Sequence, residues 1–196
     1  MITIHPKAQA LIFDIDGTLA DTMPTHYQAW YFTATQHGLH FPEELFYKWA
    51  GMPTHKIVEI INQLHGTNFS EEYLTAYKER KYQEIQQEIR PIEPIIKIAH
   101  LHFGKLPMSC GTGNYKKVAY EILDKLGIKH YFTAIISADD VLRPKPDPET
   151  FLRCAEAMEI APEFCQVFED GEPGLEAARQ AGMIVTDVRP FIGRKY

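Results

Sequence analysis

The stretch LIFDIDGTL at residues 11–19 places the strongest constraint on what this chain can fold into. An apolar run leads into Asp14 and Asp16, and a glycine and a threonine follow. Such a run is typical of a strand that is covered on both faces of a parallel sheet. Two carboxylates a few ångströms apart repel by roughly 4 kcal/mol at an effective dielectric constant of about 20. We therefore expect a divalent cation, a shared proton or a pairing base beside them.

The chain after this strand shows two patterns in succession. From about residue 21 to residue 90, apolar side chains recur at helical spacing, and we expect helices without strands. Ser70 is typical of a helix start, and the apolar stripe behind it continues to about Arg90. From residue 92 onward, short apolar runs alternate with helical patterns. The strands expected there lie at residues 106–110, 134–137, 166–168 and 183–186.

Repeated β-α-β units predict an α/β fold with a Rossmann-like, doubly wound parallel sheet and helices on both faces. We expect this core domain to comprise residues 1–20 and 92–196. Residues 21–91 would form an all-helical domain inserted after the first strand. Right-handed crossovers place the carboxyl ends of all strands along one edge of the sheet, where ligands bind.

Composition excludes several classes of function. The net charge of −6, with no dense cluster of lysine and arginine, argues against nucleic acid as a partner. No apolar run approaches the ~20 residues needed to span a membrane, and no basic-then-apolar leader is visible. The three cysteines have no metal or redox spacing and are typical of reduced core thiols. We expect a cytoplasmic protein, and nothing in the sequence demands more than a monomer.

Polar side chains follow four of the predicted strands. They are Asp14 and Asp16 after the first, Thr112 in the loop GTGN after the second, Lys145 in RPKPDP after the third, and Glu169 with Asp170 after the fourth. Since these strands end at one edge, the carboxylates, the hydroxyl and the lysine should converge on one crevice. Asn114 would cap the helix that follows the glycine loop.

Taken together, these residues resemble the haloacid-dehalogenase-like (HAD) phosphatase superfamily over essentially the whole chain. The resemblance rests on DIDGT at residues 14–18, on Thr112, on Lys145 in a KPDP context and on the Glu169-Asp170 pair. It is closer to the beta-phosphoglucomutase-like branch, which includes small sugar-phosphate phosphatases of the fructose-1-phosphatase kind. In that branch the helical insertion, here residues 21–91, is a mobile cap domain.

The resemblance implies a role for each of the core residues. Asp14 would be the nucleophile that forms an aspartyl-phosphate, and Asp16 would protonate the leaving alkoxide and then deprotonate the attacking water. Lys145 would supply fixed positive charge. Thr112, with the N–H groups of Gly113 and Asn114, would hold the phosphate at a helix N-terminus.

A phosphate dianion beside several carboxylates calls for a hard cation, and Mg²⁺ suits such a site. By resemblance, its ligands are the side chains of Asp14 and Asp170 and the backbone carbonyl of Asp16. Glu169 would be either a further ligand or a partner of the ligands.

Within the expected cap, three residues match substrate-binding positions of the branch. His26 and Lys78 match a histidine and a lysine of the branch, while Thr54 lies in the specificity loop GMPTH at residues 51–55. True beta-phosphoglucomutases carry an arginine near the position of Thr54, which grips the second phosphate of a bisphosphate intermediate. Its absence favours a phosphatase, although Lys56 or Lys78 could serve a mutase.

The resulting hypothesis is a Mg²⁺-dependent phosphatase acting on a small phosphorylated metabolite, a hexose phosphate such as fructose 1-phosphate. The first alternative is a beta-phosphoglucomutase that interconverts beta-glucose 1-phosphate and glucose 6-phosphate. The second is a non-catalytic sugar-phosphate-binding protein, which would be expected to have lost Asp14, Asp16 or Asp170. A dehalogenase is disfavoured because carbon–halogen displacement needs neither a second aspartate as acid nor a cation site.

Overall fold

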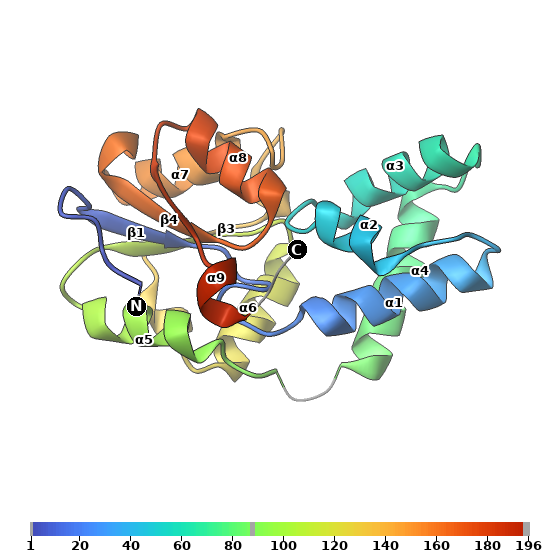
Figure 1. Cartoon of the computed structure of the whole chain (residues 1–196), viewed down its shortest axis with the longest axis horizontal. Coiled ribbons are helices and arrows are strands. Elements are labelled where there is room, and N and C mark those ends of the chain that lie inside the picture. The colour runs from blue at the N-terminus through green and yellow to red at the C-terminus, as the bar shows by residue number, and fades with distance from the viewer. Residues whose placement is uncertain (1, 87–88, 194–196) are drawn as a thin grey trace.

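Five parallel strands form the central sheet of the computed structural model, which describes residues 2–86 and 89–193 (Figure 1). The two ends of the expected core domain, at residues 1 and 196, lie outside the described residues. Residues 87–88 of the expected insertion do so as well. The strands are β1 (Ala10–Phe13), β2 (Met108–Gly111), β3 (Ala134–Ile136), β4 (Cys165–Glu169) and β5 (Ile184–Asp187). Their order is β3-β2-β1-β4-β5, and every neighbouring pair is parallel. The predicted Rossmann-like α/β fold is confirmed.

The helices fall into an inserted group and a sheet-flanking group. The inserted group is α1 (Met23–Gln36), α2 (Glu43–Lys48), α3 (Thr54–His65) and α4 (Glu71–Ile85). The flanking group is α5 (Glu93–His102), α6 (Lys116–Lys125), α7 (Glu149–Ala157), α8 (Glu172–Gln180) and the short α9 (Arg189–Ile192). None of the helices within residues 2–86 and 89–193 is both long enough and apolar enough to cross a membrane.

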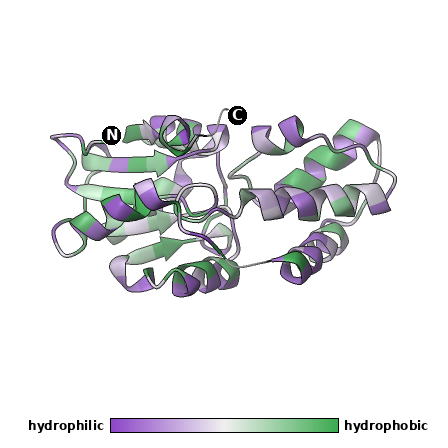
Figure 2. Cartoon of the chain, turned by 60° about the horizontal axis from the view of Figure 1, so that its bottom comes forward, coloured by the Kyte–Doolittle hydropathy of each residue, from purple (hydrophilic) through white to green (hydrophobic). Residues whose placement is uncertain are grey.

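Alternate side chains of β1 face opposite layers of helices. Leu11 and Phe13 pack in one apolar cluster with side chains of α5 and α6. Ala10 and Ile12 pack in a second cluster with side chains of α7 and α8. The strand is therefore covered on both faces, which explains its apolar character without alternation. Figure 2 shows the strands as largely hydrophobic and the helices as banded, as expected for one buried face per helix.

The inserted helices have an apolar cluster of their own, which lies beyond the carboxyl ends of the strands (Figures 1 and 2). Trp30 of α1 is its largest fully buried side chain, and its ring stacks on Phe41 with 5.6 Å between the centroids. Ser70 begins α4 as predicted and accepts a hydrogen bond of 3.3 Å from the backbone N–H of Tyr73. The helix ends at Ile85, earlier than the expected limit near Arg90.

Candidate active site

Asp14 lies at the carboxyl end of β1 and is paired with a buried lysine from the loop that follows β3. Lys145 donates hydrogen bonds of 2.8 Å to Oδ1 of Asp14 and 2.7 Å to Oε2 of Glu169. All three side chains are almost fully buried, with side-chain exposures of 3%, 1% and 1% for Asp14, Glu169 and Lys145. Burial alone would lower the pKa of Lys145, but the two carboxylates outweigh it and raise that pKa. The lysine is therefore a fixed cation.

The two carboxylates that contact this lysine belong to a buried group of three. Asp14, Glu169 and Asp170 each offer one oxygen, and these oxygens lie within 4.8 Å of one another. Burial, with the charges of Glu169 and Asp170, raises the pKa of Asp14 well above its ordinary value, although Lys145 opposes this. One lysine does not balance three buried carboxylates. The oxygen-only donor set fits a hard divalent cation such as Mg²⁺.

Both oxygens of Glu169 accept hydrogen bonds from the protein. Oε2 accepts from Lys145, while Oε1 accepts from the backbone N–H groups of Asp170 and Gly171 at 3.1 and 2.8 Å. These bonds suit a residue that holds Lys145 and the turn after β4. Asp170, in turn, accepts a hydrogen bond of 3.0 Å from Thr18 of the loop after β1.

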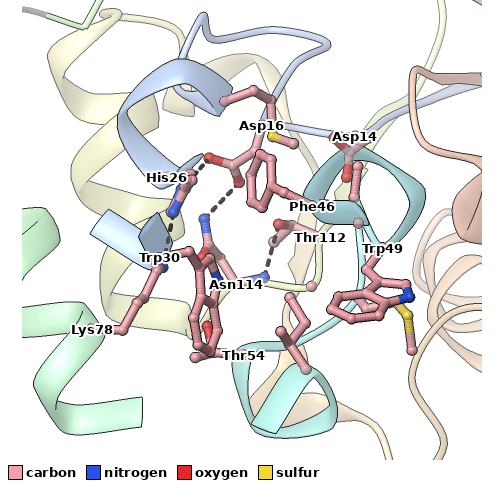
Figure 3. A pocket seen from close by; sticks show the side chains of 16 residues that line it. Asp14, Asp16, His26, Trp30, Phe46, Trp49, Thr54, Lys78, Thr112 and Asn114 are labelled. Atoms are coloured by element: carbon pink, nitrogen blue, oxygen red, sulfur yellow. Dashed lines mark hydrogen bonds and ion pairs between the residues drawn. The ribbon is translucent and has the colours of Figure 1, made fainter. Parts of the chain in front are cut away.

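Asp16 has a separate set of partners. Its Oδ1 accepts a hydrogen bond of 2.6 Å from Thr22. Nε2 of His26 donates to the same oxygen at 3.2 Å, and Asn114 donates to Oδ2 at 2.5 Å (Figure 3). Burial alone would raise the pKa of Asp16, but the bonds from His26 and Thr22 and the charge of Lys78 lower it.

The prediction that Asn114 caps a helix is wrong. Helix α6 begins at Lys116 with Tyr115 as its N-cap, and the side chain of Tyr115 makes no capping hydrogen bond. The backbone N–H of Lys116 donates to Asp139 at 2.6 Å. The amide of Asn114 instead reaches across to Asp16. A carboxylate partner gives a stronger hydrogen bond than a backbone N–H cap, and this favours the observed position.

His26 of α1 links Asp16, in the loop after β1, to Lys78 on α4. Lys78 donates a hydrogen bond of 2.9 Å to Nδ1 of His26, so this ring nitrogen acts as the acceptor. The network therefore assigns the ring proton to Nε2, which donates to Asp16. Burial and the charge of Lys78 lower the pKa of His26, so the ring is neutral near pH 7.

One cavity joins the residues at the sheet edge to the inserted helices (Figure 3). Its polar lining comprises Asp14, Asp16, His26, Thr54, Lys78, Thr112 and Asn114, with Gly113 between the last two. Its apolar wall includes Trp30, Phe46 and Trp49 from the inserted segment. Thr112 is buried, and its hydroxyl accepts a hydrogen bond of 3.0 Å from the backbone N–H of Asn114. A few polar groups on a largely apolar wall are typical of small-molecule sites.

The loop between α2 and α3 lies directly against the loops that follow β2 and β4. A Cβ atom built on Gly113 would lie 2.5 Å from the carbonyl oxygen of Gly51, and one built on Gly171 would lie 2.5 Å from that of Ala50. Both glycines therefore permit a backbone approach that any side chain would block. The inserted segment covers the acidic group in this structure.

The structure brings every site residue expected from the sequence into this one region. Asp14, Asp16, His26, Thr54, Lys78, Thr112, Gly113 and Asn114 line the cavity, while Lys145, Glu169 and Asp170 surround Asp14. No site role was expected from the sequence for three residues whose side chains hydrogen-bond to these site residues: Thr18, Thr22 and Glu79. Thr18 and Thr22 follow the two aspartates closely in the sequence, so this spacing could have been used to predict that they contact the site. Nothing in the sequence distinguishes Glu79 from the other glutamates of α4.

Comparison with known proteins shows similarity over almost the whole chain. Residues 11–188 match the family described as haloacid dehalogenase-like hydrolase. The chain is 36% identical to fructose-1-phosphate phosphatase YqaB of Escherichia coli, over 95% of this chain and 99% of that protein. It is 29% identical to beta-phosphoglucomutase of Bacillus subtilis, over 94% of this chain and 86% of that protein. Among solved structures, beta-phosphoglucomutase from Clostridium difficile superimposes with a TM-score of 0.79 at 25% identity, covering 92% of this chain and 84% of that one.

Proposed function

Since the chain belongs to the haloacid dehalogenase-like hydrolase family, in its beta-phosphoglucomutase-like branch, we propose that it is a Mg²⁺-dependent phosphatase of small sugar phosphates. Family membership and the phosphatase relatives make it a phosphoric monoester hydrolase. Fructose 1-phosphate, the substrate named for the Escherichia coli relative, is the first candidate substrate. Within the proposal, residues 21–91 act as a cap domain over a core formed by the rest of the chain.

One observation carries the proposal: Asp14 and Asp16 line the same cavity but have different hydrogen-bond partners. Asp14 lies within the acidic group beside Lys145, whereas Asp16 is hydrogen-bonded to neutral partners and is set apart from that group. Stepwise phosphoryl transfer needs both kinds of carboxylate, one as nucleophile and one as proton carrier.

In the proposed reaction, a carboxylate oxygen of Asp14 attacks phosphorus, and the bond from phosphorus to the sugar oxygen breaks. Asp16 enters this step in its protonated form and gives that proton to the leaving alkoxide. A water molecule then attacks the aspartyl-phosphate, Asp16 takes a proton from it, and the bond from Asp14 to phosphorus breaks to release inorganic phosphate. Lys145, Thr112 and the N–H groups of Gly113 and Asn114 hold the phosphoryl oxygens.

The side chains of Asp14 and Asp170 and the backbone carbonyl of Asp16 would hold Mg²⁺. The bound cation would neutralise charge on the phosphoryl oxygens and let a dianion approach the carboxylates. Because Glu169 already accepts hydrogen bonds at both oxygens, we assign it to holding Lys145.

The test is phosphate release from a panel of sugar phosphates, with Mg²⁺ and with EDTA. We expect release from hexose phosphates in Mg²⁺ and none in EDTA. Conversion of beta-glucose 1-phosphate to glucose 6-phosphate with little phosphate release would overturn the proposal in favour of a mutase. Binding of sugar phosphates without turnover would overturn it in favour of a binding protein.

A further inference from the structure

A partly buried glutamate on α4, Glu79, with 20% of its side chain exposed, contacts two cavity-lining residues, Lys78 and Thr54. We infer that Glu79, acting through Lys78 and Thr54, restricts the cavity to monophosphates whose far end is an uncharged, hydroxyl-bearing group. The inference rests on the proposed phosphatase function and adds to it a rule for which phosphate esters are accepted. Glu79 is a positioning residue here, because it meets the cavity through its two neighbours.

The geometry places one carboxylate oxygen of Glu79 between a cation and a hydroxyl. Its Oε1 accepts hydrogen bonds of 2.8 Å from Nζ of Lys78 and 3.1 Å from the hydroxyl of Thr54. Both donors line the cavity, and the Lys78 side chain is only 2% exposed. The other oxygen, Oε2, is buried and accepts no hydrogen bond from the part of the chain that the structure describes. Burial alone would raise the pKa of Glu79, but Lys78 and His26 outweigh it, so the side chain is charged near pH 7.

This pair removes the positive charge that a second phosphate would need. Among the described residues that line the cavity, Lys78 is the one with a permanent positive charge, and its charge is balanced by Glu79 at 2.8 Å. Lys56, the other candidate cation in this region, donates to both oxygens of Glu59 at 3.0 Å on the surface of α3. A second phosphate or a carboxylate on the substrate would therefore lie near a lysine whose charge is already balanced and near the partly buried negative charge of Glu79.

The hydroxyl of Thr54 adds a preference for donors. A carboxylate is an acceptor only, so the proton of this hydroxyl points to Glu79. The oxygen of Thr54 then offers lone pairs to the cavity. A sugar hydroxyl can donate to those lone pairs, whereas a phosphate dianion or a carboxylate has no proton to donate. Charge and hydrogen-bond polarity thus favour the same class of substrate.

The test compares fructose 1-phosphate with fructose 1,6-bisphosphate, which differ by one phosphate at the far end. The variant Glu79→Gln keeps the size of the side chain and removes its charge. We expect the ratio of kcat/KM for the bisphosphate to that for the monophosphate to rise at least about tenfold, equivalent to about 1.4 kcal/mol. Glu84→Gln, on the same helix with a 55% exposed carboxylate paired to Lys81, should leave the ratio unchanged.

Equal losses on both substrates in Glu79→Gln would show that the residue only supports the helix, and this would overturn the inference. Dissociation constants of both sugars, measured by calorimetry for Asp14→Asn with and without Glu79→Gln, give the same comparison without turnover. The same rise in relative bisphosphate binding is expected there, and an unchanged ratio would contradict the inference. If the wild-type protein releases phosphate from no sugar phosphate, the proposed function itself fails, which is a separate outcome.

Discussion

Asp14 and Asp16 are separated by one residue, yet their side chains meet different surroundings. Asp14 shares Lys145 with Glu169 and lies within the buried acidic group. Asp16 is held by Thr22, His26 and Asn114 instead. One pKa is raised and the other is lowered as a result. The surroundings of each aspartate, and not the side chain itself, therefore set the direction in which its pKa moves.

Replacing Asp14 by asparagine should abolish turnover, because an amide cannot form the acyl phosphate. We expect kcat to fall at least about a thousandfold, within the range seen when a nucleophile is removed. Steady-state phosphate release is the measurement. Asp124→Asn is the matched control, since Asp124 is 56% exposed and pairs with Lys129 on the surface. Substantial residual activity in Asp14→Asn would rule out this aspartate as nucleophile.

The partners of Asp16 predict how the stability of the protein depends on pH. A carboxyl group whose pKa is lowered in the folded state contributes stability above its unfolded pKa, near 3.9, and loses that contribution as pH falls through the folded pKa. Asp16→Asn should therefore cost about 1.5–3 kcal/mol of unfolding free energy at pH 7. The difference from wild type should shrink as pH falls below about 4.

Urea unfolding of both proteins at pH 7 and at successively lower pH measures this difference. An Asp16→Asn variant as stable as wild type at pH 7 would show that the hydrogen bonds to Asp16 do not offset its burial.

At the scale of elements, the site is assembled from strand ends and from one loop of the insertion. The carboxyl ends of β1 and β4 bring Asp14 and Glu169 together, and parallel register keeps Phe13 and Phe168 level. The loop around Gly51 then covers these ends from the other side. Elements distant in sequence thus enclose one volume.

Gly113→Ala should prevent the loop around Gly51 from packing against the loop after β2. The added methyl would lie 2.5 Å from the carbonyl oxygen of Gly51. Because this oxygen is a backbone atom and cannot rotate away as a side chain could, the inserted segment must shift outward. We expect kcat/KM for the sugar phosphate to fall at least about tenfold, because displacement by about 1 Å disturbs catalytic geometry. Gly127→Ala is the control: its φ of +71° carries the strain of a substituted glycine, but no atom lies within 4 Å of the added Cβ. Similar activity in the two variants would contradict this account.

The sequence predicted strands and helices well where one physical signal dominates. The strand at β1 was predicted because burial on both faces leaves only apolar residues, and the start of α4 was predicted because Ser70 caps it. The capping role predicted for Asn114 was wrong because the prediction considered only nearby residues. In the structure the side chain of Asn114 donates to Asp16, which is distant in the sequence. The hydrogen bond from Thr54 to Glu79 could not be predicted because it depends on how α4 packs against α3. Local signals thus predict the elements, whereas contacts across elements require the fold.

At the scale of the whole molecule, an acidic chain carries a buried acidic centre. The net charge is −6, and Asp14, Glu169 and Asp170 are packed together in the core. Lys145 offsets part of this charge, and a bound cation would offset more. The stability of the folded chain should therefore respond to divalent cations.

Addition of Mg²⁺ should raise the melting temperature. At a concentration 100 times the dissociation constant, binding to the folded state alone adds about 2.7 kcal/mol, or roughly 5–10 °C for a chain of this size. Differential scanning calorimetry with Mg²⁺ and with EDTA measures the shift. Asp170→Asn should lose most of it, while the surface variant Asp124→Asn should keep it. An equal shift in Asp170→Asn would place the cation elsewhere.

The hydrogen bonds to Asp16 come from two parts of the molecule. Asn114 lies in the loop after strand β2 of the sheet, and His26 lies on the inserted helix α1. Against the effect of burial, the bond from His26 lowers the affinity of Asp16 for a proton. Thermodynamic linkage is reciprocal, so a proton bound to Asp16 must weaken the hold of the helices on the sheet by the same free energy. Protonation of Asp16 is thereby coupled to the strength of one contact between the inserted helices and the sheet.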